Sequence, residues 1–343
     1  MTELLSAQIA TETRATCDDC AMGPEKGETP RFDPDLKCCT YYPELPNFTV
    51  GAIIGDEGAY GQVELSKRFK SAVGITPHGM ARPAIYQVLM QKAMHGDAFG
   101  RAKSLRCAFL DPAGRCGMWA YREPTCFSYH CKFDRGQRGA VLWLTLKALF
   151  QSIEKQLAQW CILELDPGDA AIEALEKAAN ASAPIGHNAL DGTVDREPLK
   201  AMWGTWLGRE AEFYVECWSR VSALSWNDVL AICGPSVRMH ARRLVAAHAR
   251  HESTSIPDAL HVNAYQATSA GKKIRLRTFS TTDSLVLDAN VVASLSEFDG
   301  RPTAEVVAQL AERGVTLDDD EMRKLVNFDV LIPASRLIKP ALP

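Results

Sequence analysis

Apolar residues recur every three to four positions through the middle of the chain, which is the spacing of one face of a helix. In residues 139–165 this pattern is continuous, and it predicts a long helix that ends at the Asp166-Pro167-Gly168 sequence. Ser225 begins the sequence SWND, which predicts a capping box at the start of a shorter helix. This shorter helix is expected at 225–233, and two further helices are expected at 202–224 and 237–251.

The first third of the chain lacks this period and is rich in proline and glycine, which is typical of loops. One stretch, FTVGAII at 48–54, has the apolar composition of a strand. The GDEGAYG sequence that follows is expected to be a loop, because its glycines do not have the spacing of a dinucleotide-binding fingerprint. A loop-rich region buries little apolar surface, so a bound metal is a common source of its stability.

The pattern changes again after residue 255. Two strands, HVNAYQA and KKIRLRTF, are expected on either side of a Ser-Ala-Gly turn. A helix at 289–298, a turn at Asp299-Gly300 and a helix at 303–313 follow. The spacing of Asp318 and Glu321 then predicts a capping box for a third helix, which precedes the strand FDVLIP. This order of elements predicts a winged-helix-like module.

Together these patterns predict a mainly α protein of the α+β class, with three domains. An irregular, metal-bound cysteine-cluster domain is expected at 1–138, a helical domain at 139–255, and the winged-helix-like module at 256–343.

Composition and charge bear on the possible partners and on the location of the protein. A net charge of −4 and a pI near 6.1 give no general attraction to nucleic acid or to anionic membranes. No apolar run is long enough to span a membrane and the first residues do not resemble a secretory signal, so a cytoplasmic location is expected. Thiols stay reduced in the cytoplasm, which favours metal ligation over disulfides.

No Walker A, G-x-S-x-G or H-E-x-x-H motif is present, so no catalytic residue is assigned.

Eight of the eleven cysteines lie before residue 132 and are the candidate metal ligands. They are Cys17, Cys20, Cys38, Cys39, Cys107, Cys116, Cys126 and Cys131. Eight thiols make two sets of four, the number that zinc and cubane iron–sulfur clusters both take. Adjacent side chains of an extended chain point to opposite sides, so Cys38 and Cys39 are expected to serve different centres unless the backbone bends there. The other three, Cys161, Cys217 and Cys233, are expected to pack in cores.

The segment RCAFLDPAGRCGMWAYREPTCFSYHC resembles the YkgJ-type cysteine-cluster proteins, a zinc- or iron-chelating family that includes flagellin lysine N-methylase. Its four cysteines, from Cys107 to Cys131, fall at the cysteine positions of the family, and Asp111–Gly114 matches the acidic-glycine turn. Glu123, inserted between arginine and proline, and Phe127, in place of an arginine, depart from the family pattern. The resemblance covers roughly residues 15–135 and implies metal chelation.

Thiolate ligation suits iron–sulfur clusters and zinc alike. The aromatic residues around the third cysteine group favour a 4Fe–4S cluster, because exclusion of water protects sulfide and tunes the reduction potential. One or two such clusters are therefore expected, with zinc as the alternative. His78 and His130 are alternative ligands, although a polar surface role is expected for both.

The C-terminal module is similar to PqqD-like peptide-binding winged helices, through the pattern Phe298, Asp299-Gly300 and Thr303. The resemblance implies a peptide or protein partner, which would add as a strand beside an edge strand at Lys273–Phe279 and be attracted by Arg275 and Arg277. DNA is not expected, because the candidate recognition helix carries two glutamates and one arginine.

The leading expectation is an iron–sulfur protein with a redox, sensing or peptide-modifying role. The alternative is a zinc-stabilised scaffold that binds a peptide or protein partner without catalysis. If the chain is an enzyme, the family resemblance implies a cluster-dependent modification of a protein or peptide.

Overall fold

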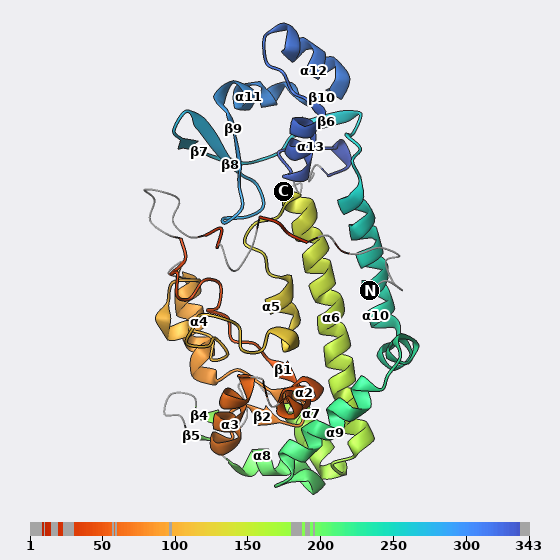
Figure 1. Cartoon of the computed structure of the whole chain (residues 1–343). Helices are drawn as coiled ribbons and strands as arrows, with labels where there is room; N and C mark the ends of the chain where they lie inside the picture. Colours follow the sequence, from red (N-terminus) through yellow and green to blue (C-terminus); the bar gives the residue numbers. More distant parts are fainter. Residues whose placement is uncertain are drawn as a thin grey trace, which may run out of the picture. The chain divides into compact units, whose positions relative to one another are not determined.

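The computed structural model describes residues 9, 11–14, 20–22, 31–56, 58, 60–95, 98–179, 187–188, 193–194 and 196–336. Helices make up 56% of the described residues and strands 11%, in several small sheets, so the expected α+β class is confirmed (Figure 1). Among the described residues, no helix combines the length and the apolar character that a membrane span requires.

The chain forms two compact units. Unit 1 contains Met1–Ala21, His130–Thr145 and Arg242–Pro343, and unit 2 contains Met22–Tyr129 and Leu146–Ala241. The helix α6 (Gly136–Leu165) contributes residues to both units, and the domain boundary expected at residue 138 lies inside it.

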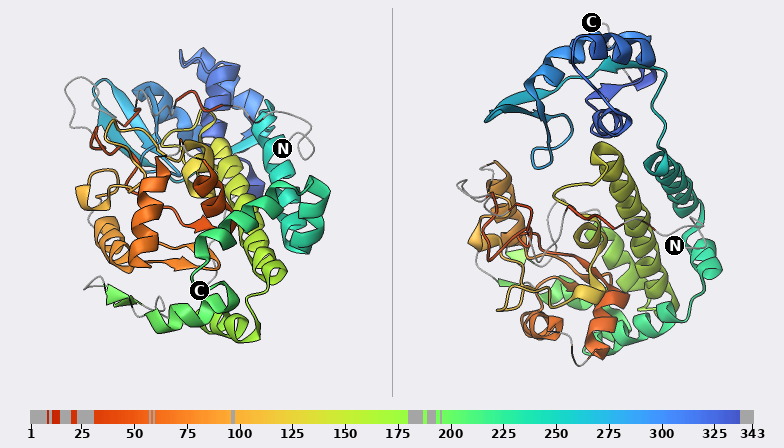
Figure 2. Two further views of the ribbon diagram at one scale, coloured as in Figure 1. Left: turned by 60° about the horizontal axis from the view of Figure 1, so that its bottom comes forward. Right: turned by 45° about the horizontal axis from the view of Figure 1, so that its top comes forward.

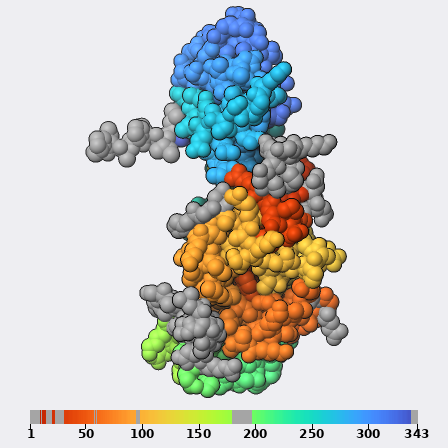
Figure 3. Space-filling view, turned by 90° about the vertical axis from the view of Figure 1, so that its left-hand side faces the viewer, coloured from red at the N-terminus to blue at the C-terminus, as the bar shows by residue number. Residues whose placement is uncertain are grey.

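Unit 2 is built from helices around small sheets. Its antiparallel sheet has the order β1 (Leu45–Pro46), β3 (Gly79–Met80), β2 (Ile75–Thr76), and a separate pair is β4 (His187–Asn188) and β5 (Thr193–Val194). Its shorter helices are α2 (Asn47–Gly55), α3 (Gly61–Ser71), α4 (Ala84–His95), α5 (Pro124–Ser128), α7 (Asp169–Ala179), α8 (Arg196–Trp203) and α9 (Glu210–Ser222). The segment that includes α3 and α4 is at the surface on the face shown in Figure 3, in orange.

The strand expected at 48–54 is wrong, because these residues form the helix α2. α2 is apolar nearly all round and lies beside α9 (Figures 1 and 2). At the contact Gly51 faces the backbone of Tyr214 so closely that a Cβ atom would lie 1.9 Å from the carbonyl oxygen. A short apolar run does not distinguish a buried strand from a buried helix, and here tertiary packing selects the helix.

The long helix expected at 139–165 is confirmed as α6, which ends before Asp166 and Gly168, both at positive φ. A continuous helix at 202–224 is wrong. The chain leaves α8 for a short 3-10 turn at Gly204–Trp206 before α9 begins, because Gly204 and Gly208 both have positive φ.

The two helices expected on either side of the Gly234-Pro235 stop form α10 (Trp226–Glu252), which is interrupted at Gly234 with φ 63° and ψ −150° (Figure 2). The capping interaction at its start is confirmed. The Ser225 hydroxyl donates to the Asp228 carboxylate at 2.6 Å, and the Asp228 N–H donates back to that hydroxyl at 3.3 Å.

The C-terminal part of unit 1 contains two three-stranded antiparallel sheets. One has the order β10 (Asp299–Pro302), β6 (Ala259–Val262), β11 (Leu331–Ile332), and the other β7 (Gln266–Ala270), β8 (Lys273–Arg277), β9 (Leu285–Asp288). HVNAYQA is therefore not one strand, since it is divided between β6 and β7 in different sheets. Asp299-Gly300, expected as a turn, begins β10 because Asp299 pairs with His261 of β6.

The expected edge position of Lys273–Phe279 is also wrong. β8 is the middle strand of its sheet and is hydrogen-bonded to β7 on one side and to β9 on the other. A peptide strand cannot pair with a strand whose two sides are already occupied. The winged-helix resemblance and a peptide partner elsewhere on the module stay predictions.

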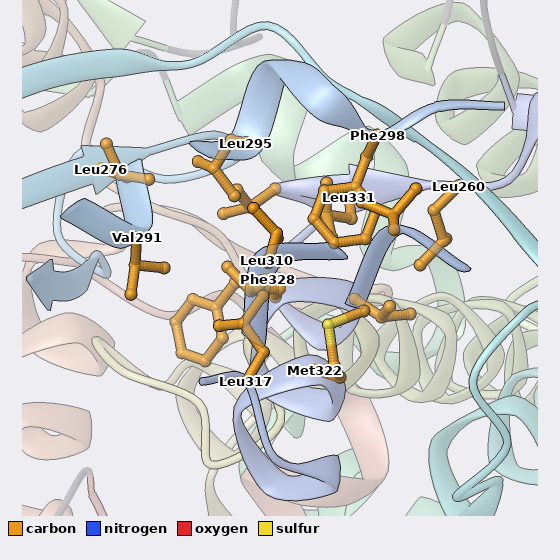
Figure 4. Close-up of a cluster of buried hydrophobic side chains, with 14 residues drawn as sticks. Leu260, Leu276, Val291, Leu295, Phe298, Leu310, Leu317, Met322, Phe328 and Leu331 are labelled. Carbon is orange, nitrogen blue, oxygen red and sulfur yellow. The ribbon is translucent and has the colours of Figure 1, made fainter. Parts of the chain in front are cut away.

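The core of this module is a cluster of buried apolar side chains around Leu310 and Phe328 (Figure 4). It is contributed by both sheets and by α11 (Ala289–Ser294), α12 (Thr303–Glu312) and α13 (Asp319–Asn327). The expected helices at 289–298 and 303–313 are confirmed in their positions, and the first is shorter than expected because it tightens into a 3-10 turn at Leu295–Glu297.

The capping box at the start of α13 is confirmed. The Asp318 carboxylate accepts from the Glu321 N–H at 2.8 Å, and the Glu321 carboxylate accepts from the Asp318 N–H at 3.3 Å. Asp318→Ala is expected to lower the free energy of unfolding of this region by about 1 kcal/mol, because it removes the acceptor for a helix N-terminal N–H. Asp318→Asn is the control, since its amide oxygen accepts the same bond. Equal losses in urea denaturation of both variants would contradict this role.

Candidate metal centre

The structure divides the predicted ligands between the two units. Cys20 and Cys131 belong to unit 1, and Cys17 lies outside the described residues. The ten described cysteines form no disulfide with one another. The five predicted ligands in unit 2 are all half-buried: Cys38, Cys39, Cys107, Cys116 and Cys126.

A tight loop brings Cys107 and Cys116 together. Leu110 and Cys116 form an antiparallel bridge, and the Gly117 N–H donates to the Phe109 carbonyl at 2.8 Å. The turn between them is closed by Asp111, whose carboxylate accepts from the Arg115 N–H at 2.8 Å. The residues that match the acidic-glycine turn of the family therefore form a hydrogen-bonded turn. This turn folds the chain back, so that Cys107 and Cys116 lie on the two segments that flank it.

A guanidinium that the sequence did not single out supports this loop. Arg106, next to Cys107, donates to the carbonyl of Asp111 at 2.9 Å and to that of Leu110 at 3.3 Å. Its positive charge also lowers the pKa of Cys39. No spacing rule in the sequence marks this arginine, because its partners are backbone carbonyls.

The Cys38-Cys39 pair joins the same region through a bend. Lys37 has a φ of 52°, and the Cys107 N–H donates to the Cys39 carbonyl at 2.8 Å. The Cys38 side chain hydrogen-bonds to that of Cys39, so the two neighbours do not point to opposite sides. This hydrogen bond is the main reason that the pKa of Cys39 is lowered to about 7, and the charge of Lys37 adds to it. The sharp bend that one shared site requires is present, which removes the reason for assigning the pair to separate centres.

Cys126 reaches this region from the first turn of α5. The Glu123 carboxylate caps the helix by accepting from the Cys126 N–H at 3.1 Å, and Pro124 occupies the next position, where its missing N–H costs nothing. The departure from the family pattern at Glu123 thus has a structural role. Burial, followed by the negative charge of Glu123, raises the pKa of the Cys126 thiol well above its usual range.

Charge effects connect four of these thiols. Burial raises the pKa of Cys107 to about 12, and the charges of Cys39 and Cys116 contribute to the rise. Cys126 is influenced in the same way by Cys107 and Cys116. Cys39 and Cys116 therefore lie near Cys107, and Cys107 and Cys116 lie near Cys126, although the four come from three separate stretches of the sequence. Without a counter-charge, ionising all four in this half-buried environment is unfavourable.

The thiols are neighbours without being gathered at one point. Within the part of the chain that the structure describes, no group of three or more histidine, cysteine, aspartate or glutamate side chains is arranged to hold a metal ion. The donor type and number suit a thiolate-bound metal, whereas the spacing between the sulfur atoms does not.

The surrounding aromatic residues shield the four thiols only in part. Phe109 is fully buried and contacts the ring of Tyr42, which in turn contacts Tyr86. Trp119, in contrast, is 56% exposed and stacks against the Arg122 guanidinium at 3.5 Å from the ring centroid. The ring of Trp119 therefore faces solvent, whereas Phe109 is buried.

The two candidate histidine ligands lie elsewhere. His130 belongs to unit 1 and packs against Trp143 with ring centroids 4.4 Å apart. His78 lines a pocket of unit 2, where burial and the charge of Lys155 lower its pKa. Neither is part of a metal-holding group in the described structure.

The three cysteines expected to pack in cores are buried, which confirms that prediction. Cys161 of α6 and Cys217 of α9 are both fully buried, and the Cys161 thiol lies 3.9 Å from the Cys217 carbonyl. Cys233, just before the break in α10, is 4% exposed.

The family resemblance rests on the spacing of Cys107, Cys116, Cys126 and Cys131, of which the structure assigns the first three to unit 2 and the last to unit 1. Comparison of the chain with known proteins gave no match to a family model, to a curated protein or to a solved structure.

Proposed function

We propose that this chain is a metal-binding protein whose centre is held by Cys39, Cys107, Cys116 and Cys126, and that the centre is a 4Fe–4S cluster. The observation that carries the proposal is the backbone arrangement of the thiol-bearing loops: the Cys107 N–H donates to the Cys39 carbonyl, and the bridge between Leu110 and Cys116 folds the chain back toward Cys107. The influence of Cys107 and Cys116 on the pKa of Cys126 adds the fourth thiol to this region. Four cysteines are the complete ligand set of a cubane cluster. Such a cluster supplies one-electron transfer, or a centre that responds to oxidants.

The arrangement of the loops supports this use. Each thiol is on a turn, a loop or the first turn of a short helix, where side chains can reorient without unfolding a long element. Bringing the sulfur atoms to one centre requires such a closing movement, because they are not at ligating positions in the structure. Metal binding and ordering of ligand loops are commonly linked in this way.

Basic groups favour the ionised form of the ligands. Lys37, Arg106 and Arg122 all lower the pKa of Cys39, so this thiol is easier to ionise than Cys107 or Cys126. Cys39, Cys107 and Cys126 would hold the metal as thiolates, and the positive charge of a bound metal would offset the cost of ionising the half-buried Cys107 and Cys126. The hydrogen bond from Cys38 would tune Cys39 without adding a ligand.

The remaining predicted ligands, Cys17, Cys20, Cys38 and Cys131, stay predictions from the sequence. With a cluster bound, the protein would have a role in redox reactions, in sensing or in the modification of a peptide or protein. A zinc-stabilised scaffold that binds a peptide or protein partner is the alternative function.

Metal analysis separates the two functions. Protein isolated without oxygen is expected to be brown, with broad absorption near about 400 nm, and to contain about four iron and four sulfide per chain for one cluster. Colourless protein with one equivalent of zinc and no sulfide would contradict the iron–sulfur proposal and favour the scaffold.

A further inference from the structure

A second site in unit 2 adjoins the region of the thiols, because Glu123, which caps the helix of Cys126, is part of its wall. It is a pocket of about 880 Å³ between the small sheet and α6. The sheet side includes Glu44, Arg82 and residues of β1 and β3, and the helix side includes Glu154 and Lys155. Glu123, just before α5, completes the wall. This volume is within the range of about 300–1,000 Å³ that is typical of small-molecule sites.

The charges that line the pocket do not balance. Arg82 lies 3.5 Å from the Glu44 carboxylate, donates to the Tyr41 hydroxyl at 2.6 Å, and stacks over the Tyr41 ring. This pair is therefore neutral as a whole. Among the described residues of the lining, the remaining charged groups are two carboxyls, Glu123 and Glu154, and one cation, Lys155, whose side chain is exposed. The lining thus carries one more negative group than positive groups when both carboxyls are ionised.

Glu154 is the group without a partner. Glu123 is 5% exposed and has a hydrogen bond from the Cys126 N–H, whereas Glu154 has no hydrogen bond and no ion pair with any described residue. Burial, followed by the negative charge of Glu123, raises the pKa of Glu154 to about 8. When two carboxyls share a half-buried site, the repulsion between their negative charges disfavours ionising both. A positive charge between them reduces this repulsion.

We propose that this pocket binds a small organic cation with N–H donors, whose charged head lies against Glu123 and Glu154. An ammonium and a guanidinium group both supply a single positive charge and N–H donors for carboxylate oxygens. A metal ion is a poorer occupant, since no described residues form a metal-holding group here. The site does not depend on the identity of the metal proposed at the cysteines.

The test is an NMR titration of the full-length protein with four probes: n-butylamine, n-propylguanidine, neutral 1-pentanol and acetate. Saturable binding of at least one of the two cations is expected, with 1-pentanol and acetate binding at least tenfold more weakly. Binding of butylamine alone or of propylguanidine alone identifies which head group the site takes. No saturable binding of either cation, or equal binding of 1-pentanol, would overturn the proposal.

Two variants on one helix make the matched comparison. Glu154→Gln removes the ionisable carboxyl in the pocket, whereas Glu164→Gln changes a glutamate of α6 that pairs with Arg220 outside it. Cation affinity is expected to fall at least tenfold in Glu154→Gln and to stay within twofold in Glu164→Gln. Metal content should be unchanged in both, which separates failure here from failure at the cysteines. Unchanged affinity in Glu154→Gln would contradict the proposal.

Proton release gives a second readout. At pH 7 Glu154 is mostly protonated with a pKa of about 8, so binding a cation should expel close to one proton. Affinity should therefore rise as the pH increases from 6 to about 8. The other titratable groups described in the lining of this pocket are Tyr41, Glu44, His78, Arg82, Glu123 and Lys155. Calorimetry in two buffers of different ionisation enthalpy measures the released proton, and its persistence in Glu154→Gln would assign it to another group and overturn the role of Glu154.

Discussion

Replacing Cys126 with serine is expected to remove most of the metal from the protein and to weaken metal affinity by about 100-fold or more. The serine hydroxyl is a poor ligand for soft metal centres, and loss of a group that only supports a ligand already costs about 10–100-fold. Cys126 is the clearest choice of the four, because its thiol is influenced by both Cys107 and Cys116 and lies on a defined helix turn. Iron, sulfide and zinc analysis of the purified variant measures the effect.

Cys161→Ala is the matched control for this experiment. Cys161 is fully buried in unit 2, but it packs against α9 and is not among the four neighbouring thiols. The control should keep its full metal content and lose about 1–2 kcal/mol of stability, as small truncations in a core do. If Cys126→Ser kept all its metal, the assignment of Cys126 to the centre would be wrong.

Gly51→Ala is expected to destabilise unit 2 by about 3 kcal/mol. The added Cβ would lie 1.9 Å from the Tyr214 carbonyl oxygen and 2.5 Å from its carbon, and these backbone atoms of α9 cannot rotate away as a side chain could. The helices α2 and α9 would have to separate, and overpacking of this kind costs about 1–3 kcal/mol or more. Chemical denaturation followed by circular dichroism measures the loss.

Gly55→Ala, at the C-terminal end of the same helix, controls for the change from glycine to alanine. A Cβ at Gly55 meets no atom within 4 Å. This variant should be as stable as the original protein or slightly more stable, because alanine restricts the unfolded chain. Equal stability of Gly51→Ala and Gly55→Ala would contradict the close packing of α2 on α9.

The parts of the fold that follow from local pattern could be predicted from the sequence. The sequence of α6 has apolar residues at helical spacing along its whole length, and Asp318 with Glu321 is a local capping signal. Both the helix and the capping box are therefore predicted correctly from the sequence. The helix α2 is not predicted from the sequence, because its short apolar run is equally suited to a buried strand. The break near Gly204 also depends on tertiary structure: a Cβ there would lie 1.9 Å from the Pro167 carbonyl oxygen, a contact that no local pattern predicts.

The candidate site could be predicted in composition but not in arrangement. Spacing identified the cysteines as candidate ligands, yet the bend at Lys37 that brings Cys38 and Cys39 to one side is set by the fold. The pocket gave no sequence signal at all. Glu123 and Glu154 are 31 positions apart, and Glu154 has the appearance of an ordinary polar residue on a helix.

The central claim, that four thiolates hold one metal centre in unit 2, is tested most directly by X-ray absorption at the edge of the bound metal in anaerobically isolated protein. Four sulfur neighbours per metal at about 2.3 Å are expected and, for the 4Fe–4S cluster, an iron–iron distance in the same spectrum. The same measurement on Cys107→Ser should show less metal or a lower sulfur count. A first shell dominated by nitrogen or oxygen, or a spectrum that Cys107→Ser leaves unchanged, would contradict it.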